Sequence, residues 1–564
     1  MNRGRSIKEI ERPVFFAEAG RQPPPRQVVT LAFLAEQLPD PLISQELARS
    51  LCVETEASVV LVRLESRDGA GGINNEAQPE LFLNGEFHLP PQMRKTDDGF
   101  HTLTLLCSRS EPPTPPGIES LLSQLSRQFR YVLIQTQVDE QPASWLFELL
   151  LRSNLAYLFL KAATQDVYHL DLVMRQARAR CRDGGVHVKP VGCLAKGEHI
   201  GGFDLLMERV AGPVHMFVRD CPRLEGVEEP RLQTAPSGSF RADLRLLARE
   251  IGGCLVGLAL SSGAAKGFAH IGVIQVLEEN GIHVDVVAGS SMGAYVGALW
   301  AHGCDGRELE RLARELETRW SLFSLIDPTF PPYRGFLRGF AVKKRLMQSI
   351  ANARFADLVR PLRVVAANLA TLERVVFSSG EVATAVHAST AVPGICVPIT
   401  IEGETYTDGG IVDPLPVDVL REMGVARVIA VNVIPTPQRI RHGMQAELDL
   451  ARHNAKQGRK FFGKANPPDR RVSYFARGSV LEILLRSVQS GQIRMAESSC
   501  LQADVVLRPD IYDDRWLDYR YPGKFIALGR QAAERHLQEI KALVARKEAI
   551  HESIFAPEPV AAML

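Results

Sequence analysis

The chain lacks the features that would place it across a membrane or outside the cell. Its 564 residues contain no apolar run of about 18 residues, so no helix is expected to span a bilayer. The first residues, MNRGRSIKEIERP, have no apolar core, which argues against a secretory signal. None of the nine cysteines stands in a C-x-x-C pair, and their number is odd. Buried, reduced thiols in the cytoplasm are therefore the simpler expectation.

A strong charge of one sign is also missing. Lys and Arg number 66 against 65 Asp and Glu, which gives a formal charge of +1. No global field would attract nucleic acid, so we expect no such partner. The composition, 45% hydrophobic and 23% charged, is ordinary for a globular protein.

The first part of the chain predicts a separate α/β domain over residues 28–220, after a charged tail at 1–27. Apolar runs such as VVTLAFL, VVLVRL and YVLIQT alternate with helix-like segments, which indicates a parallel sheet. The loop after the first run, AEQLPDPLIS, lacks G-x-x-x-x-G-K-[ST], the loop that cradles nucleotide phosphates. A structural or partner-binding domain is favoured over a nucleotide-controlled switch. Residues 221–252 are predicted to be a linker and an amphipathic helix.

The second part is organised around VDVVAGSSMGAYVGAL at residues 284–299. An apolar strand, a G-x-S-x-G turn and a helix of small residues follow one another directly. This is the context in which a serine becomes a nucleophile, because Gly289 and Gly293 allow a sharp turn that exposes Ser291 at a helix N-terminus. The alternative is a serine that only caps the helix.

Two more stretches carry candidate site residues. The strand VGLAL is followed by SSGAAKG, a small-residue loop whose N–H groups could face an anion. ITIEGETYTDGG predicts a hairpin that ends at Asp408, which on its own is more typical of an ordinary turn. VARVIAVNV predicts the last buried strand.

Three ordered blocks carry a resemblance to a known family. LALSSGAAKGFAHIGVIQVLEENGI, VVAGSSMGAYVGALWA and AVHASTAVPGICVPITIEGETYTDGGIVDPLPVDV resemble the patatin-like phospholipases. LEILLRSVQSGQIRM and ADVVLRPD resemble its bacterial and neuropathy-target-esterase branch. The resemblance covers residues 253–545 and leaves 546–564 as a tail. It implies a three-layer α/β/α domain with a mostly parallel sheet, preceded by a degenerate P-loop NTPase-like α/β domain.

The same resemblance implies a serine lipid acyl hydrolase that acts on phospholipid or lysophospholipid without metal or cofactor. Its catalytic residues would be a Ser-Asp dyad, Ser291 and Asp408, with no histidine base. His270 could supply such a base, but a structural role is the simpler expectation. The oxyanion loop would be formed by Ser262, Gly263, Ala264, Lys266 and Gly267, and the motif glycines are Gly289, Gly293, Gly409 and Gly410.

The oxyanion loop departs from the family pattern, because Ser262 and Ala264 stand where the family has glycine. A Cβ in the left-handed region costs about 1–2 kcal/mol. Loss of one oxyanion donor would slow the reaction about a hundredfold or more. The alternative function is therefore a catalytically weakened lipid-binding or scaffold protein.

Two segments suggest peripheral contact with a membrane. Residues 320–340, from Trp320 to Phe340, mix aromatic and basic side chains, which suits a bilayer interface or, alternatively, an internal lid. Residues 439–471, from Arg439 to Arg471, carry a basic excess that suits anionic headgroups or a solvated face. The expected location is the cytoplasm, with contact at the inner membrane surface.

Overall fold

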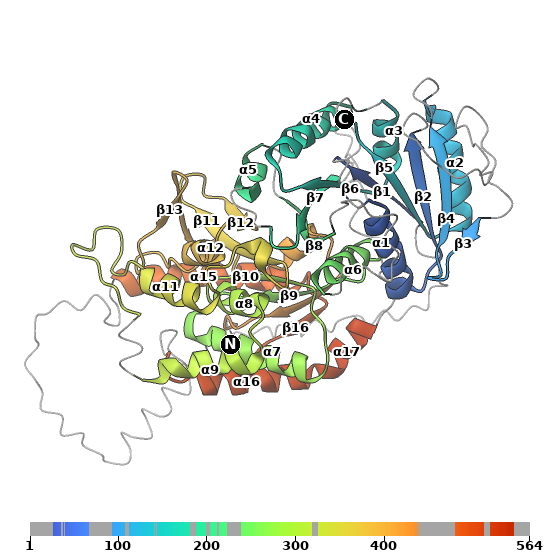
Figure 1. Cartoon of the computed structure of the whole chain (residues 1–564). Coiled ribbons are helices and arrows are strands. Elements are labelled where there is room, and N and C mark those ends of the chain that lie inside the picture. Colours follow the sequence, from blue (N-terminus) through green and yellow to red (C-terminus); the bar gives the residue numbers. More distant parts are fainter. Residues whose placement is uncertain are drawn as a thin grey trace, which may run out of the picture.

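Two layered α/β domains make up the structure (Figure 1). The computed structural model describes residues 26–34, 38, 40–66, 93–107, 112–139, 142, 144–180, 188–198, 203–210, 214–222, 238–318, 325–436, 438, 441, 480–511 and 519–545. None of the helices in these ranges is long and apolar enough to cross a membrane.

The N-terminal sheet is parallel except at one edge. Its strand order is β3-β4-β2-β5-β1-β6-β7-β8, with β3 antiparallel to β4. The central strands are apolar on both faces because helices cover both of them. The strands are β1 (Gln27–Phe33), β2 (Val59–Ser66), β3 (Arg94–Lys95), β4 (His101–Cys107), β5 (Tyr131–Gln137), β6 (Leu155–Lys161), β7 (Val188–Ala195) and β8 (Met216–Cys221).

Helices α1 (Asp40–Thr55) and α6 (Ser239–Ile251) pack on one face of this sheet. The other face is covered by α2 (Pro115–Gln128), α3 (Ser144–Arg152), α4 (Thr164–Arg180) and α5 (Phe203–Val210). The apolar stripe of α6, which includes Phe240, Leu244 and Leu247, is buried in the same core as β1. The helix predicted between the domains thus completes the N-terminal core.

The second sheet is mixed, with order β13-β14-β11-β10-β9-β15-β16, and β12 also pairs with β11. Strands β9, β10, β11, β15 and β16 are parallel, whereas β12, β13 and β14 run antiparallel to their neighbours. The bounds are β9 (Val256–Leu260), β10 (Val286–Ser290), β11 (Leu362–Asn368), β12 (Arg374–Phe377), β13 (Ile399–Ile401), β14 (Glu404–Asp408), β15 (Arg427–Val431) and β16 (Val505–Leu507). The prediction that β15 is the last strand was wrong, because the short β16 pairs beside it.

Helices cover both faces of this sheet too, which confirms the predicted three-layer domain. One face carries α7 (Ala269–Glu279), α8 (Met292–His302), α9 (Gly306–Arg314), α11 (Phe340–Ser349), α12 (Val382–Ser389), α16 (Pro522–Arg535) and α17 (Leu537–Ala545). The other face carries α13 (Val417–Glu422) and α15 (Val480–Cys500). Short 3-10 helices connect them: η3 (Ala264–Phe268), η4 (Glu315–Glu317), η5 (Phe355–Asp357) and η6 (Gly409–Ile411).

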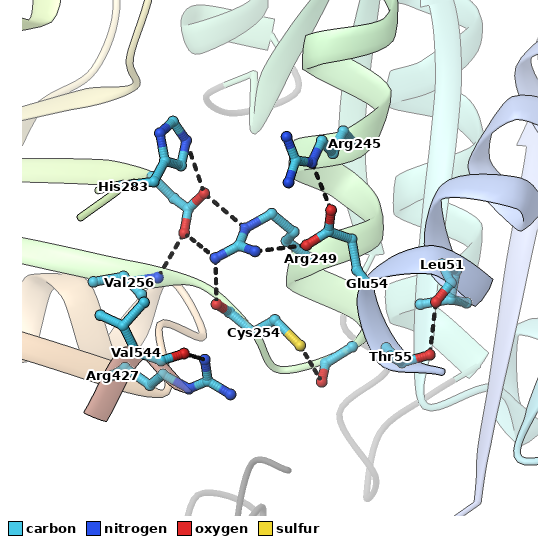
Figure 2. Close-up of polar contacts among 12 residues, drawn as sticks. Leu51, Glu54, Thr55, Arg245, Arg249, Cys254, Val256, His283, Arg427 and Val544 are labelled. Atoms are coloured by element: carbon cyan, nitrogen blue, oxygen red, sulfur yellow. Dashed lines mark hydrogen bonds and ion pairs between the residues drawn. The ribbon is translucent and has the colours of Figure 1, made fainter. Parts of the chain in front are cut away.

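Arg249 of α6 joins the two domains (Figure 2). Its guanidinium donates to Glu54 of α1 at 2.6 Å and to both carboxylate oxygens of Asp285, at 2.8 and 2.9 Å. Asp285 also accepts the N–H of Val256, the first residue of β9, at 2.7 Å. All three charged side chains are largely buried, so this network ties α1, α6 and the second sheet together.

Candidate active site

The turn after β10 holds Ser291 in a strained backbone conformation. Ser291 has φ +52° and ψ −119°, a combination that L residues rarely adopt. It stands between the end of β10 and the start of α8, as the strand-turn-helix pattern predicted. A Cβ on Gly293 would lie 2.2 Å from the carbonyl oxygen of Leu260, so glycine is required there. The turn therefore combines a tight backbone contact with a buried serine held at the junction of strand and helix.

Sheet register brings Asp408 to the same place. One edge of β11 pairs with β12, and its other edge pairs first with β10 and then with the antiparallel β14, so that the last residues of β10 and β14 are neighbours along β11. Ser290 is opposite Val365, and Asp408 is opposite the next residue, Ala366. Two segments that are distant in sequence thus meet end to end along one strand.

The side chains of Ser291 and Asp408 are hydrogen-bonded. The Ser291 hydroxyl donates to Oδ2 of Asp408 at 2.5 Å, and Oδ1 accepts the N–H of Gly410 at 2.7 Å. Both residues are buried. Burial raises the pKa of Asp408 to about 6, although the hydrogen bonds from Ser291 and Gly410 act to lower it. A Cβ on Gly409 would meet the Val365 carbonyl oxygen at 2.2 Å, so the turn must stay close to the sheet.

The end of α12 contacts both members of this pair. The N–H of Ser291 donates to the hydroxyl of Ser389 at 2.9 Å. The carbonyl of Ala391 accepts the N–H of Asp408 at 3.0 Å. The sequence did not single out Ser389, although it lies in the AVHASTAVPG stretch, because nothing local shows which backbone its hydroxyl meets.

The predicted oxyanion loop lies beside the pair. The N–H of Ser262 donates to the Pro414 carbonyl at 2.8 Å, and that of Lys266 to the Gly263 carbonyl at 3.1 Å. Among the described residues, no acceptor is found for the N–H groups of Gly263 and Ala264, which leaves these two available to an anion. Ala264 has φ +48°, so the loop keeps the conformation that favours glycine despite its Cβ.

His270 is engaged elsewhere. Its Nε2 lies 2.9 Å from the Ser261 carbonyl oxygen and must donate to it. Complete burial lowers the pKa of His270 to about 4, so the ring is neutral. Ser291 therefore has a carboxylate, and not a histidine, as its hydrogen-bond partner.

Ser291 lies in the wall of an apolar cavity of about 740 Å³. This volume is within the range of sites that bury a ligand of drug size. The wall is built by η3, α8, α9, η4, the segment 325–339 and α11, and includes Ala264, Phe268, Met292, Leu299, Leu312, Leu316, Phe336 and Val342. Such a lining suits a long hydrocarbon chain.

Of the two segments considered for membrane contact, the structure describes most of 320–340 but only Arg441 of 439–471. In the 320–340 segment, Phe330 and Tyr333 are 95% and 91% exposed, and Phe330 also lies at the cavity wall, which Phe336 lines too. Trp320 and Phe323 lie outside the described residues. The basic segment 439–471 also lies outside them, with the exception of Arg441. The aromatic segment therefore borders both solvent and the cavity.

Comparison with known proteins gives relatives for the second domain. Residues 258–421 match the model of a family described as patatin-like phospholipase. Lysophospholipase NTE1 of Pyricularia oryzae is 32% identical over 202 residues, which are 35% of this chain and 13% of that protein. An uncharacterized NTE family protein of Mycobacterium tuberculosis is 37% identical over 178 residues, 32% of this chain and 49% of that protein. The chain therefore spans about half or less of these relatives' length.

Solved structures share only weak likeness to the whole chain. VipD from Legionella pneumophila is 17% identical, with 51% of this chain and 67% of that chain covered and a TM-score of 0.31. A ParA family ATPase from Chlorobium tepidum is 12% identical, with 40% and 98% covered and a TM-score of 0.30.

Proposed function

We propose that the chain is a serine lipid acyl hydrolase with a Ser-Asp dyad, because residues 258–421 match the patatin-like phospholipase model. Its substrates are phospholipids or lysophospholipids. The observation that carries the proposal is the 2.5 Å hydrogen bond between the Ser291 hydroxyl and Asp408 in the wall of an apolar cavity.

The dyad supplies a nucleophile and a base. Asp408 accepts the proton of Ser291 as Oγ attacks the ester carbonyl carbon. When the tetrahedral intermediate collapses, the alcohol leaves with the proton from Asp408. Water then gives a proton to Asp408 and attacks the acyl-enzyme, which releases the fatty acid and the free serine. Burial supports this role, because a carboxylate with a raised pKa is a stronger base.

The N–H groups of Gly263 and Ala264 are the proposed oxyanion donors. Both lack a protein acceptor among the described residues, and Ala264 shares the cavity wall with Ser291. Donors fixed in advance stabilise the negative charge that develops on the carbonyl oxygen. The Ala264 Cβ is the observation that favours the second candidate, a lipid-binding protein with weakened catalysis, since a positive φ is strained there.

Fatty-acid release separates the two candidates. We expect wild type to release fatty acid from lysophosphatidylcholine, and Ser291→Ala and Asp408→Ala to lose this activity. Ala264→Gly is expected to keep or raise the rate. Equal residual rates in wild type and both dyad variants would eliminate the hydrolase.

The lipid is proposed to enter from a membrane surface. Phe330 and Tyr333 are almost fully exposed on a segment that also lines the cavity, and Arg334 and Arg338 lie in the same segment. Aromatic and basic side chains together favour the interface of an anionic bilayer. Attachment of this kind would be peripheral, at the inner membrane surface of the cytoplasm.

The N-terminal domain is proposed to be structural and not a nucleotide switch. Asp40 lies buried in the first turn of α1, where its Oδ2 accepts hydrogen bonds from Gln135 at 2.9 Å and Gln137 at 3.3 Å. A helix N-terminus attracts phosphate, but here a carboxyl group occupies it. Calorimetry with ATP should give no binding heat, and saturable heat would contradict this assignment.

A further inference from the structure

The polar side chains in the cavity wall are mostly satisfied by the protein itself. The hydroxyls of three of them donate to backbone carbonyls: Thr329, Ser349 and Thr390. Arg345 forms an ion pair with Glu315 at 2.8 Å. The hydroxyl of Tyr519 differs, because no hydrogen-bond partner for it is found among the described residues.

Tyr519 lies at the dyad end of the cavity. Its ring packs edge-on against Phe268, the last residue of η3, with centroids 5.9 Å apart and planes at 90°. Burial raises the pKa of Tyr519, and the nearby Cys396 and Asp408 add to the effect. The hydroxyl therefore stays protonated at neutral pH and can donate.

Helix α16, which begins just after Tyr519, is held rigidly against α7, along which it runs (Figure 1). A Cβ on Gly272 of α7 would lie 2.0 Å from the carbonyl oxygen of Ile526. One on Gly529 of α16 would lie 1.9 Å from the carbonyl oxygen of Ala269. Backbones this close leave little freedom for the two helices to slide, and the ring of Tyr519 is held just before α16 by its contact with Phe268.

We propose that the Tyr519 hydroxyl binds substrate, by donating a hydrogen bond to an uncharged oxygen of the glycerol unit of a lysophospholipid. This inference rests on the proposed function, since it places the glycerol on the alcohol side of the ester that Ser291 attacks. A phosphate would call for an arginine or lysine. The cavity-lining Arg345 is already paired with Glu315. A neutral phenol suits a hydroxyl or ester oxygen instead, while the acyl chain takes the apolar wall.

Binding of lysophosphatidylcholine tests this without turnover. Its Kd is measured by calorimetry, below the critical micelle concentration, for Ser291→Ala and for Ser291→Ala with Tyr519→Phe. The loss of one hydrogen bond should weaken binding roughly three- to tenfold. The free fatty acid of the same chain length, which has no glycerol, should bind both variants equally. Tyr521→Phe is the matched control, because this tyrosine is 56% exposed and outside the cavity wall.

The proposal would be overturned if Tyr519→Phe left the Kd of lysophosphatidylcholine unchanged, or weakened the binding of lysophosphatidylcholine and of the fatty acid equally. It would also be overturned if Tyr521→Phe weakened lysophosphatidylcholine binding as much as Tyr519→Phe does, or if lysophosphatidylcholine did not bind measurably. Failure of the proposed function looks different: wild type would release no fatty acid, whatever the effect of Tyr519→Phe on Kd.

Discussion

The N–H of Ser291 donates a hydrogen bond to the hydroxyl of Ser389, 2.9 Å away, and both residues are buried. Ser291 has a φ of +52°, which costs an L residue about 1–2 kcal/mol. Ser389 ends α12, which is packed in the core of the domain. The Ser389 hydroxyl therefore helps to hold Ser291 at its positive φ, which is unfavourable for the backbone of an L residue.

Ser389→Ala should lower kcat about fivefold and leave KM nearly unchanged, because it removes about 1 kcal/mol of support from the turn without touching the cavity. Steady-state kinetics with lysophosphatidylcholine gives both constants. Ser153→Ala is the control, since that serine is also buried and hydrogen-bonded but lies in the N-terminal domain. A kcat within twofold of wild type would remove the positioning role.

The pH dependence of kcat/KM should report Asp408. Its carboxylate must be unprotonated to accept the Ser291 proton, so activity should rise with pH through a midpoint near 6, the pKa to which burial raises it. Asp413, in the same turn, is the competing group, because burial raises its pKa to about 7 and the neighbouring Asp418 adds to this. The midpoint should survive Asp413→Asn. A flat profile from about pH 4 to 8 would contradict the role of Asp408.

Arg249→Ala should destabilise the chain by about 3 kcal/mol, because it removes the largely buried cation that the carboxylates of Glu54 and Asp285 share. Unfolding in urea measures this loss. Arg245→Ala is the matched control: Arg245 is on the same helix and also pairs with Glu54, but its side chain is 60% exposed. It should cost less than about 1 kcal/mol. Equal losses of unfolding free energy in Arg249→Ala and Arg245→Ala would contradict the view that Arg249 stabilises the contact between the domains.

Replacing Phe330 and Tyr333 together by serine should weaken binding to anionic vesicles about tenfold, since each ring loses apolar area that would enter the interface. Co-sedimentation with vesicles measures the partition. Leu501→Ser, at a residue that is 85% exposed elsewhere on the domain, should have no effect. If the double variant bound anionic vesicles as well as wild type, the two rings would not contact the membrane.

Sequence patterns predicted those parts of the site that are encoded locally. The strand, the G-x-S-x-G turn and the helix around Ser291 come from one continuous stretch, and the structure has them there. The pairing of Ser291 with Asp408 depends on β14 taking over from β10 along β11. Register of this kind is not visible in periodicity, so only the family resemblance placed Asp408 beside the serine.

Ser389 and Tyr519 could not be found in this way. Each acts through a contact with a distant segment: Ser389 with the Ser291 backbone, and Tyr519 with Phe268. Serine and tyrosine are also common in positions without any function. The packing of α6 on the N-terminal sheet was hidden for the same reason, because an amphipathic stripe shows that a helix is buried but not against which surface.

The central claim is that Ser291 is a nucleophile activated by Asp408. Its most direct test is the mass of the intact protein after reaction with a fluorophosphonate, in which the serine oxygen bonds to phosphorus and fluoride leaves. Wild type should gain one adduct that maps to Ser291, and Ser291→Ala should gain none. Asp408→Asn should react at least about a hundredfold more slowly than wild type. An adduct on another residue, or labelling of Ser291→Ala at the wild-type rate, would contradict the account.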